Sequence, residues 1–247
     1  MDRLIYTSLS AMRGAMARQQ ATANNLANAS TPGFRADIAE AQALWLEGPS
    51  LQDRALASEE VVNADMKPGA ITATGRDLDV AITGDSLLAD QAPDGEEAYT
   101  RRGDLQLSST GLLTTGAGRP VMGQGGPITV PPADRISIAD DGRILFVPAG
   151  GDPANLQELD RLKLVSPAGG PVVKGLDGLF RVQGGGVLPP DPEGRVVTGS
   201  LEQSNVSASK ALVDMIDASR SWDMQLKLIT SARDLDGASA DLMRLPE

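Results

Sequence analysis

Apolar side chains recur every three to four residues at both ends of the chain, the spacing of a helix that buries one narrow stripe. The stripe near the N-terminus is formed by Ile5, Leu9, Met12, Met16, Gln19, Ala23 and Leu26. The stripe near the C-terminus is formed by Leu212, Met215, Ser219, Trp222, Leu226 and Ile229. The pattern therefore predicts two helices, over residues 4–29 and 205–243, with Ser204, Asn205 or Ser207 as the N-cap of the second.

The middle of the chain changes to a period of two, which is typical of strands with one buried face. The alternating apolar positions are Leu78, Val80 and Ile82, then Leu105 and Leu107, then Ile136 and Ile138. Turn sequences separate the short apolar runs at Pro93-Asp94-Gly95, Ser109-Thr110-Gly111 and Asp140-Asp141-Gly142. Because no long helical spacing occurs between residues 70 and 200, we expect antiparallel hairpins and an all-β region there.

These patterns predict an α+β fold, in which a central all-β domain is flanked by N- and C-terminal helices. We expect an N-terminal helix over 1–30, a connector over 31–70, a β domain over 71–200 and a C-terminal helix over 201–247. Neither stripe can be buried by its own helix, so the two helices should pair as a coiled-coil-like layer. Charge favours this pairing, because residues 1–35 hold four arginines and one acid, whereas residues 200–247 hold eight acids and five bases.

Composition narrows the chemistry. The 247 residues include no histidine and no cysteine, which excludes an imidazole base, a thiolate nucleophile, disulfides and the usual zinc sites. The net charge of −11 disfavours binding to a phosphate backbone. The first residues, MDRLIYTSLSAM, contain an early acid and no continuous apolar run, so we do not expect a cleaved secretory signal.

The stretch ATANNLANASTPGF (21–34) places Asn24, Asn25 and Asn28 near the end of the first predicted helix. Asparagine is a poor helix-interior residue, because its amide competes for backbone hydrogen bonds. One interpretation is that these amides sit beside Leu26 at a helix–helix contact and fix its register. The other is that Asn28 ends the helix and the other two amides are exposed.

The chain then leaves the predicted helix through a tight turn. Thr31 precedes a proline and is pushed out of the helical region, and Pro32-Gly33 fits the two central positions of a type II turn. Phe34 follows directly and is available as an apolar anchor.

Three short patterns resemble a hydrolase motif, a metal site and a phosphate-binding loop, but each has a simpler structural explanation. Ser207-x-x-Lys210 has the spacing of a serine–lysine hydrolase, but its companion motifs are absent and a helix cap explains it. Asp77 and Asp79 share a strand face without further ligands, which favours a solvated face. The GQGGP segment (123–127) lacks the P-loop lysine and reads as a turn. We therefore expect no catalytic residue, no metal and no cofactor.

Three longer segments carry a family resemblance. NNLANASTPGFRA (24–36), TGRDLDVAITGDSLLADQAPDGEEAYTRRGDLQLSSTGLLTT (74–115) and GSLEQSNVSASKALVDMIDASRSWDMQLKLI (199–229) resemble, in this order, motifs of the bacterial flagellar axial proteins. Within that family of rod, hook and hook-associated proteins, the opening MDRLIYTSLSAM and the turn NASTPGFRA look most like the proximal rod type. Distal rod and hook-type proteins remain the alternatives inside the family.

The resemblance implies a non-enzymatic structural subunit of the flagellar basal-body rod, assembled helically into the drive shaft for motility. It implies copies of the chain and other rod proteins as partners, with no nucleic acid and no small-molecule substrate. It also implies unfolded export through the flagellar type III apparatus, without a cleaved signal, to the periplasmic rod. In such a subunit the paired helices form the inner layer, and we expect them to be largely disordered in an isolated monomer.

The expected assembly interface follows the two terminal motifs. Its N-terminal members are Asn24, Asn25, Leu26, Asn28, Thr31, Pro32, Gly33 and Phe34. Its C-terminal members are Leu201, Asn205, Met215, Ile216, Trp222, Met224 and Ile229. Two classes outside the family stay open from the residues alone: a soluble hydrolase that uses Ser207 and Lys210, and a free-standing adhesin-like or phage-tail-like β protein.

Overall fold

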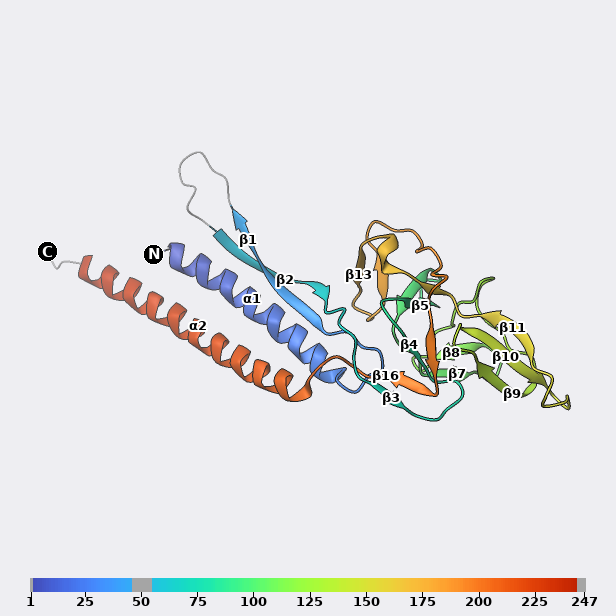
Figure 1. Cartoon of the computed structure of the whole chain (residues 1–247). Helices are drawn as coiled ribbons and strands as arrows, with labels where there is room; N and C mark the ends of the chain where they lie inside the picture. The colour runs from blue at the N-terminus through green and yellow to red at the C-terminus, as the bar shows by residue number, and fades with distance from the viewer. Residues whose placement is uncertain (1, 46–54, 244–247) are drawn as a thin grey trace. The chain divides into compact units, whose positions relative to one another are not determined.

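The computed structural model describes residues 2–45 and 55–243, and it confirms the predicted α+β class (Figure 1). Its contacts divide the chain into two compact units. We call the first the helical unit; its described part contains both helices and the first two strands. We call the second the β unit; it consists of Asn28–Ala36 and Ala64–Val206.

Helices α1 (Asp2–Ala27) and α2 (Ala208–Met243) pack against each other and run in opposite directions within the helical unit (Figure 1). The buried residues of this pair include Ala15 and Ala21 on α1 and Ala211 and Ala232 on α2. Small side chains let two helix backbones approach closely, whereas the larger residues of the predicted stripes are half-buried or, like Met16, exposed. The pairing was thus predicted correctly, but the stripe residues are not the most buried ones.

The helical unit also contains strands β1 (Asp37–Trp45) and β2 (Ala55–Ala64), which pair as a two-stranded sheet. Strand β1 contacts α1. Both strands lie in the segment 31–70, which we expected to be a connector of weak pattern. Alanine and acidic residues dominate both sequences, and these residue types favour strands only weakly, so periodicity gave little signal.

The β unit is built entirely from short strands and turns, apart from the three-residue 3-10 helix η1 (Pro167–Gly169). Its largest sheet has the strand order β12-β5-β6-β14-β13, and a three-stranded sheet has the order β11-β10-β9. The remaining pairs are β15-β4, β16-β3 and β7-β8, and the strands of the β unit pair in antiparallel fashion. The bounds are β3 (Ile71–Ala73), β4 (Val80–Ile82), β5 (Leu87–Gln91), β6 (Glu97–Thr100), β7 (Leu105–Leu107), β8 (Leu113–Thr115), β9 (Ala133–Ile138), β10 (Arg143–Pro148), β11 (Gln157–Arg161), β12 (Leu164–Val165), β13 (Val172–Lys174), β14 (Phe180–Val182), β15 (Val196–Thr198) and β16 (Ser200–Glu202).

All three predicted turns connect neighbouring antiparallel strands. Pro93-Asp94-Gly95 lies between β5 and β6, Ser109-Thr110-Gly111 between β7 and β8, and Asp140-Asp141-Gly142 between β9 and β10. The glycine that ends each turn sequence (Gly95, Gly111 or Gly142) has positive φ, a conformation that such hairpins require and side chains resist.

Two large hydrophobic clusters form most of the core of the β unit, and β5 separates them. Leu87 belongs to one cluster and its neighbour Leu88 to the other, because successive side chains of a strand point to opposite faces. Strand β4 is buried on both faces as well, so the alternation of buried and exposed positions predicted for Leu78, Val80 and Ile82 does not hold there. The tyrosine Tyr99 accepts a hydrogen bond from the backbone N–H of Leu188 at 2.7 Å, so its buried hydroxyl is satisfied.

One side chain expected on a solvated strand face is buried instead. Asp79 is 1% exposed; Thr74 donates a hydrogen bond to its carboxylate at 2.6 Å, and Arg76 lies 3.6 Å away. Within the described residues, no group of three acidic side chains is arranged to hold a metal ion. No helix among them is long and apolar enough to cross a membrane.

Candidate assembly interface

The turn that ends the N-terminal motif has the predicted geometry. The N–H of Phe34 donates to the carbonyl of Thr31 at 3.3 Å, and Gly33 has a φ of +67°, as the third position of a type II turn requires. A Cβ atom on Gly33 would lie 2.3 Å from the backbone of Arg101. Glycine is therefore needed both for its backbone conformation and for the close approach of another chain segment.

Within the helical unit, two of the three asparagines bind the start of β1. The Asn25 amide accepts a hydrogen bond from the N–H of Asp37 at 2.7 Å and donates to its carbonyl at 2.9 Å, as a neighbouring strand would. Asn24 donates to the Asp37 carboxylate. The two amides therefore bind the start of β1 in the same chain, a role that neither of the two sequence interpretations anticipated.

The third asparagine belongs to the β unit. The Asn28 side-chain oxygen accepts a hydrogen bond from the Thr31 hydroxyl at 3.1 Å, and its backbone carbonyl accepts from the Thr31 N–H at the same distance. These two bonds close the chain immediately before Pro32. Asn28 thus shapes the turn, close to the capping role that was the second interpretation.

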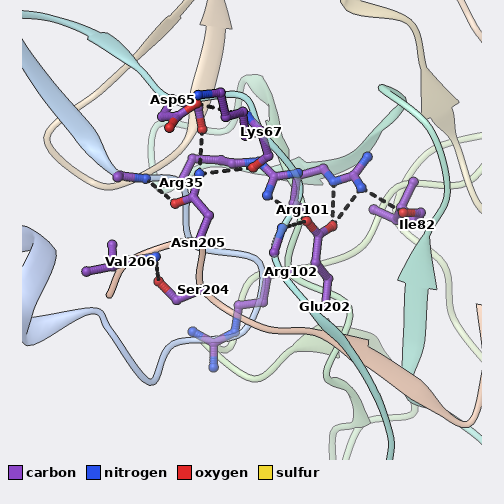
Figure 2. Close-up of polar contacts among 12 residues, drawn as sticks. Arg35, Asp65, Lys67, Ile82, Arg101, Arg102, Glu202, Ser204, Asn205 and Val206 are labelled. Atoms are coloured by element: carbon purple, nitrogen blue, oxygen red, sulfur yellow. Dashed lines mark hydrogen bonds and ion pairs between the residues drawn. The ribbon is translucent and has the colours of Figure 1, made fainter. Parts of the chain in front are cut away.

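A buried ion cluster joins three distant segments of the β unit (Figure 2). The Glu202 carboxylate lies 2.6 Å from the guanidinium of Arg35 and 2.6 Å from that of Arg101. All three side chains are at most 3% exposed. The backbone N–H of Gly69 also donates to the carboxylate, and the carbonyl of Glu202 accepts from Gly33, both at 2.8 Å.

The cluster carries more positive than negative charge, because one carboxylate serves two guanidinium groups. Burial lowers the pKa of Arg101 from its usual value, Glu202 opposes this shift and Arg35 adds to it. Arg101 also donates to the carbonyls of Ile82, Gly84 and Ser86 at 2.7 Å each. Among the described residues, by contrast, the Nε of Arg35 finds no hydrogen-bond acceptor. Glu202 is therefore the counter-charge on which both arginines depend.

Neighbouring contacts fasten the same segments. The Asn205 amide accepts from the Ala36 N–H at 2.7 Å and donates to the carbonyls of Asp65 and Lys67 at 2.8 and 3.0 Å (Figure 2). The ammonium of Lys174 lies 3.7 Å from the centre of the buried Phe34 ring and donates to the carbonyl of Arg35. Phe34 and Asn205 are thus anchors inside one chain.

The helical unit, by contrast, presents apolar side chains to solvent. A groove of about 190 Å³ lies between α1 and α2 and is lined by Met16, Gln19, Ser219 and Trp222, all members of the predicted stripes. Among the α2 side chains that the structure describes, the large exposed apolar ones are Leu212, Val213, Ile216, Met224, Leu226, Leu228 and Leu235. Large exposed apolar areas on a folded chain mark protein contacts.

The fifteen expected interface residues therefore fall into two sets. Ile216 and Met224 are exposed on α2, and Leu26, Met215, Trp222 and Ile229 are half-buried in the helical unit. The remaining residues bind or pack within their own chain: Asn24, Asn25, Asn28, Thr31, Pro32, Gly33, Phe34, Leu201 and Asn205.

Sequence reasoning missed the ion cluster, although each member lies in a motif that had been singled out. Arg35 follows PGF, Arg101 follows AYT, and Glu202 follows SL. The one sequence feature that could have indicated the cluster is a charged residue next to apolar or turn residues in each motif. Ser207 has the predicted capping role: its hydroxyl accepts a hydrogen bond from the N–H of Lys210 at 3.4 Å at the start of α2.

The same three segments match three family models. Residues 5–35 match the "Flagella basal body rod protein" model, residues 81–146 match "Flagellar hook protein FlgE/F/G D1 domain", and residues 197–242 match "Flagellar basal body rod FlgEFG protein C-terminal". Each matched segment contributes one residue of the ion cluster. The chain belongs to the flagellar basal-body rod protein family and is a structural subunit of the rod.

Within this family, the chain is most like the FlgF proteins. It is 44% identical to the flagellar basal-body rod protein FlgF of Salmonella typhimurium and 45% identical to that of Escherichia coli, over 99% of this chain and 100% of each relative. The flagellar basal-body rod protein FlgG of Bacillus subtilis is 29% identical, over 95% of this chain and 97% of the relative. The identity to these two FlgF proteins is thus higher than the identity to this FlgG protein.

Proposed function

We propose that the chain assembles helically with copies of itself and with other rod proteins into the rotating shaft of the flagellum. The observation that carries this proposal is the set of large exposed apolar residues on α2, which the chain does not bury itself. A contact between two different surfaces of identical subunits does not close on itself unless the rotation fits a ring. Such a contact therefore builds a filament.

The two units have different tasks in this proposal. The expected helical segments 1–30 and 201–247 contribute α1 and α2 to the inner layer of the rod, the β domain 71–200 is the second unit, and 31–70 connects the two. Helices packed between subunits resist shear, because close-packed interiors deform little. The rod then transmits torque through its helical layer.

The expected interface residues divide accordingly. We infer that Ile216 and Met224 contact neighbouring subunits directly, together with the half-buried Leu26, Met215, Trp222 and Ile229. The asparagines, the Thr31–Phe34 turn, Leu201 and Asn205 support the interface by holding the ends of the motifs in place. The chain acts without catalysis in this role.

Export and location follow from the same role. We infer that the chain reaches the periplasmic rod unfolded, through the flagellar type III export apparatus, without removal of a signal peptide. Membership of the flagellar rod family supports this inference.

The test is the incorporation of two full-length variants into basal bodies isolated from the producing bacterium. Ile216→Asp/Met224→Asp should lower the amount of the chain in the rod about tenfold or more, because each charge must be desolvated in the contact. The matched control is Leu176→Asp, since Leu176 is a fully exposed leucine of the β unit. Equal incorporation of both variants, or absence of the wild-type chain from intact basal bodies, would contradict the proposal.

A further inference from the structure

The last strands of the β unit complete its first ones. Strand β15 pairs with β4, and β16 pairs with β3. Within the described residues, neither β3 nor β4 has another strand in its sheet. The start of the β unit therefore lacks its strand partners until residues 196–202 are in place.

The ion cluster adds an electrostatic condition to this closure. Arg35 and Arg101 are buried in the closed unit, and Glu202 is the residue that forms ion pairs with both. Removing one partner from a buried ion pair leaves an uncompensated charge, which is strongly destabilising. A closed unit without Glu202 would bury two guanidinium groups with no counter-charge from this cluster.

Backbone contacts also require residues 200–206 to be in place before the β unit can close. The carbonyl of Glu202 accepts from Gly33, and Asn205 binds the backbone of Ala36, Asp65 and Lys67. Residues 200–206 thus occupy a position between the N-terminal turn and the segment 65–69. Neither of these two segments can adopt its final contacts earlier.

We propose that Glu202 is a closing latch, which makes folding of the part of the β unit around Arg35 and Arg101, including β3, β4 and β6, wait for the C-terminal end of that unit. In a chain that emerges with its N-terminus first, this part then closes in one late step. Arg101 and Glu202 are 101 residues apart in the sequence. The contact that closes the unit is therefore non-local and slow to form. The latch is independent of the assembly proposed above, because it concerns one chain by itself.

The order of closure is tested on the full-length wild-type chain, by pulsed hydrogen exchange during refolding from urea. We expect β4 and β6 to become protected in the same kinetic phase as β16. Earlier protection of β4 and β6, while β16 still exchanges, would overturn the latch. This measurement needs no variant, so it stands even if a substitution prevents folding.

The role of the charge is tested with Glu202→Gln in the full-length chain. Protection of β4, β6 and β14 in the native state should fall about 100-fold or more, since a buried pair has lost one partner. Glu158→Gln is the matched control, because Glu158 pairs with Arg143 at an exposed site and should leave these strands unchanged. A loss confined to residues 69–73 and 200–206 would show a local contact and no latch.

A double variant separates charge from shape. Arg35→Met in the Glu202→Gln chain removes one of the two uncompensated charges and should restore part of the lost protection. No recovery would mean that Glu202 acts through packing alone, and the electrostatic part of the proposal would fall.

Discussion

At the scale of single residues, the residues of the N-terminal motif make contacts inside their own chain. Gly33, Phe34 and Arg35 stand next to each other, and each makes a different contact: a close backbone approach, a buried ring under an ammonium group, and a buried ion pair. A sequence pattern can indicate the turn, because turn chemistry is local. It cannot identify the partners, because Arg101, Lys174 and Glu202 are brought there only by the folded β unit.

The clearest residue-scale prediction concerns Gly33. Gly33→Ala should lower the free energy of unfolding by at least about 2 kcal/mol, because it combines a left-handed backbone conformation with a clash against Arg101. The loss is measured by urea unfolding of the full chain, followed on the β unit. The control is Gly118→Ala, which has a similar positive φ of 79° but open space around the added atom. It should lose only about 1 kcal/mol, and equal losses would mean that the close approach is unimportant.

At the scale of helices and strands, the local sequence predicted the turns between strands correctly but did not predict which residues are buried. The three hairpin turns were located correctly, because glycine and its neighbours specify a turn within a few residues. The pair β1 and β2 was missed, because alanine gives no clear alternation. The burial of Asp79 and of both faces of β4 was missed too, because burial depends on which strands lie above and below.

Strand β5 permits a prediction about pH. Its residue Asp90 is fully buried, and this burial raises the pKa of the carboxyl, although a hydrogen bond from Arg119 opposes the shift. A carboxyl whose pKa is higher in the folded state binds a proton more readily when folded, so its contribution to stability increases as pH falls towards the unfolded value of 3.8. The wild type should therefore gain stability relative to Asp90→Asn between pH 7 and pH values of about 4, in urea unfolding at each pH.

An exposed carboxyl supplies the control of opposite sign. A hydrogen bond from Arg143 lowers the pKa of Asp141, so its contribution is present at neutral pH and is lost as pH falls through the lowered value. Relative to Asp141→Asn, the wild type should lose stability on acidification. If Asp90→Asn and Asp141→Asn shift in the same direction, burial does not control the titration of Asp90.

At the scale of the whole molecule, the two units differ in how much each buries alone. The β unit contains large hydrophobic clusters and a buried ion cluster, whereas the buried apolar residues of the helix pair are chiefly alanines. The amphipathic stripes of the two helices could be recognised in the sequence, since they repeat over many turns. The extent to which the stripes are buried could not be predicted from the sequence, because most of the large side chains on α2 are exposed in the single chain.

This difference predicts how the chain behaves before assembly. In a dilute solution of the full-length monomer, α1 and α2 should exchange their amide hydrogens rapidly while the β unit stays protected, because burial of a few alanines does not offset the entropy lost on ordering two long helices. The measurement is native-state hydrogen exchange at low concentration, compared with the same chain in isolated basal bodies. There, the helices should become protected, since neighbouring subunits cover the apolar residues of α2. Strong protection of both helices in the dilute monomer would contradict this prediction, and it would mean that the helix pair is a preformed element that docks into the rod already folded.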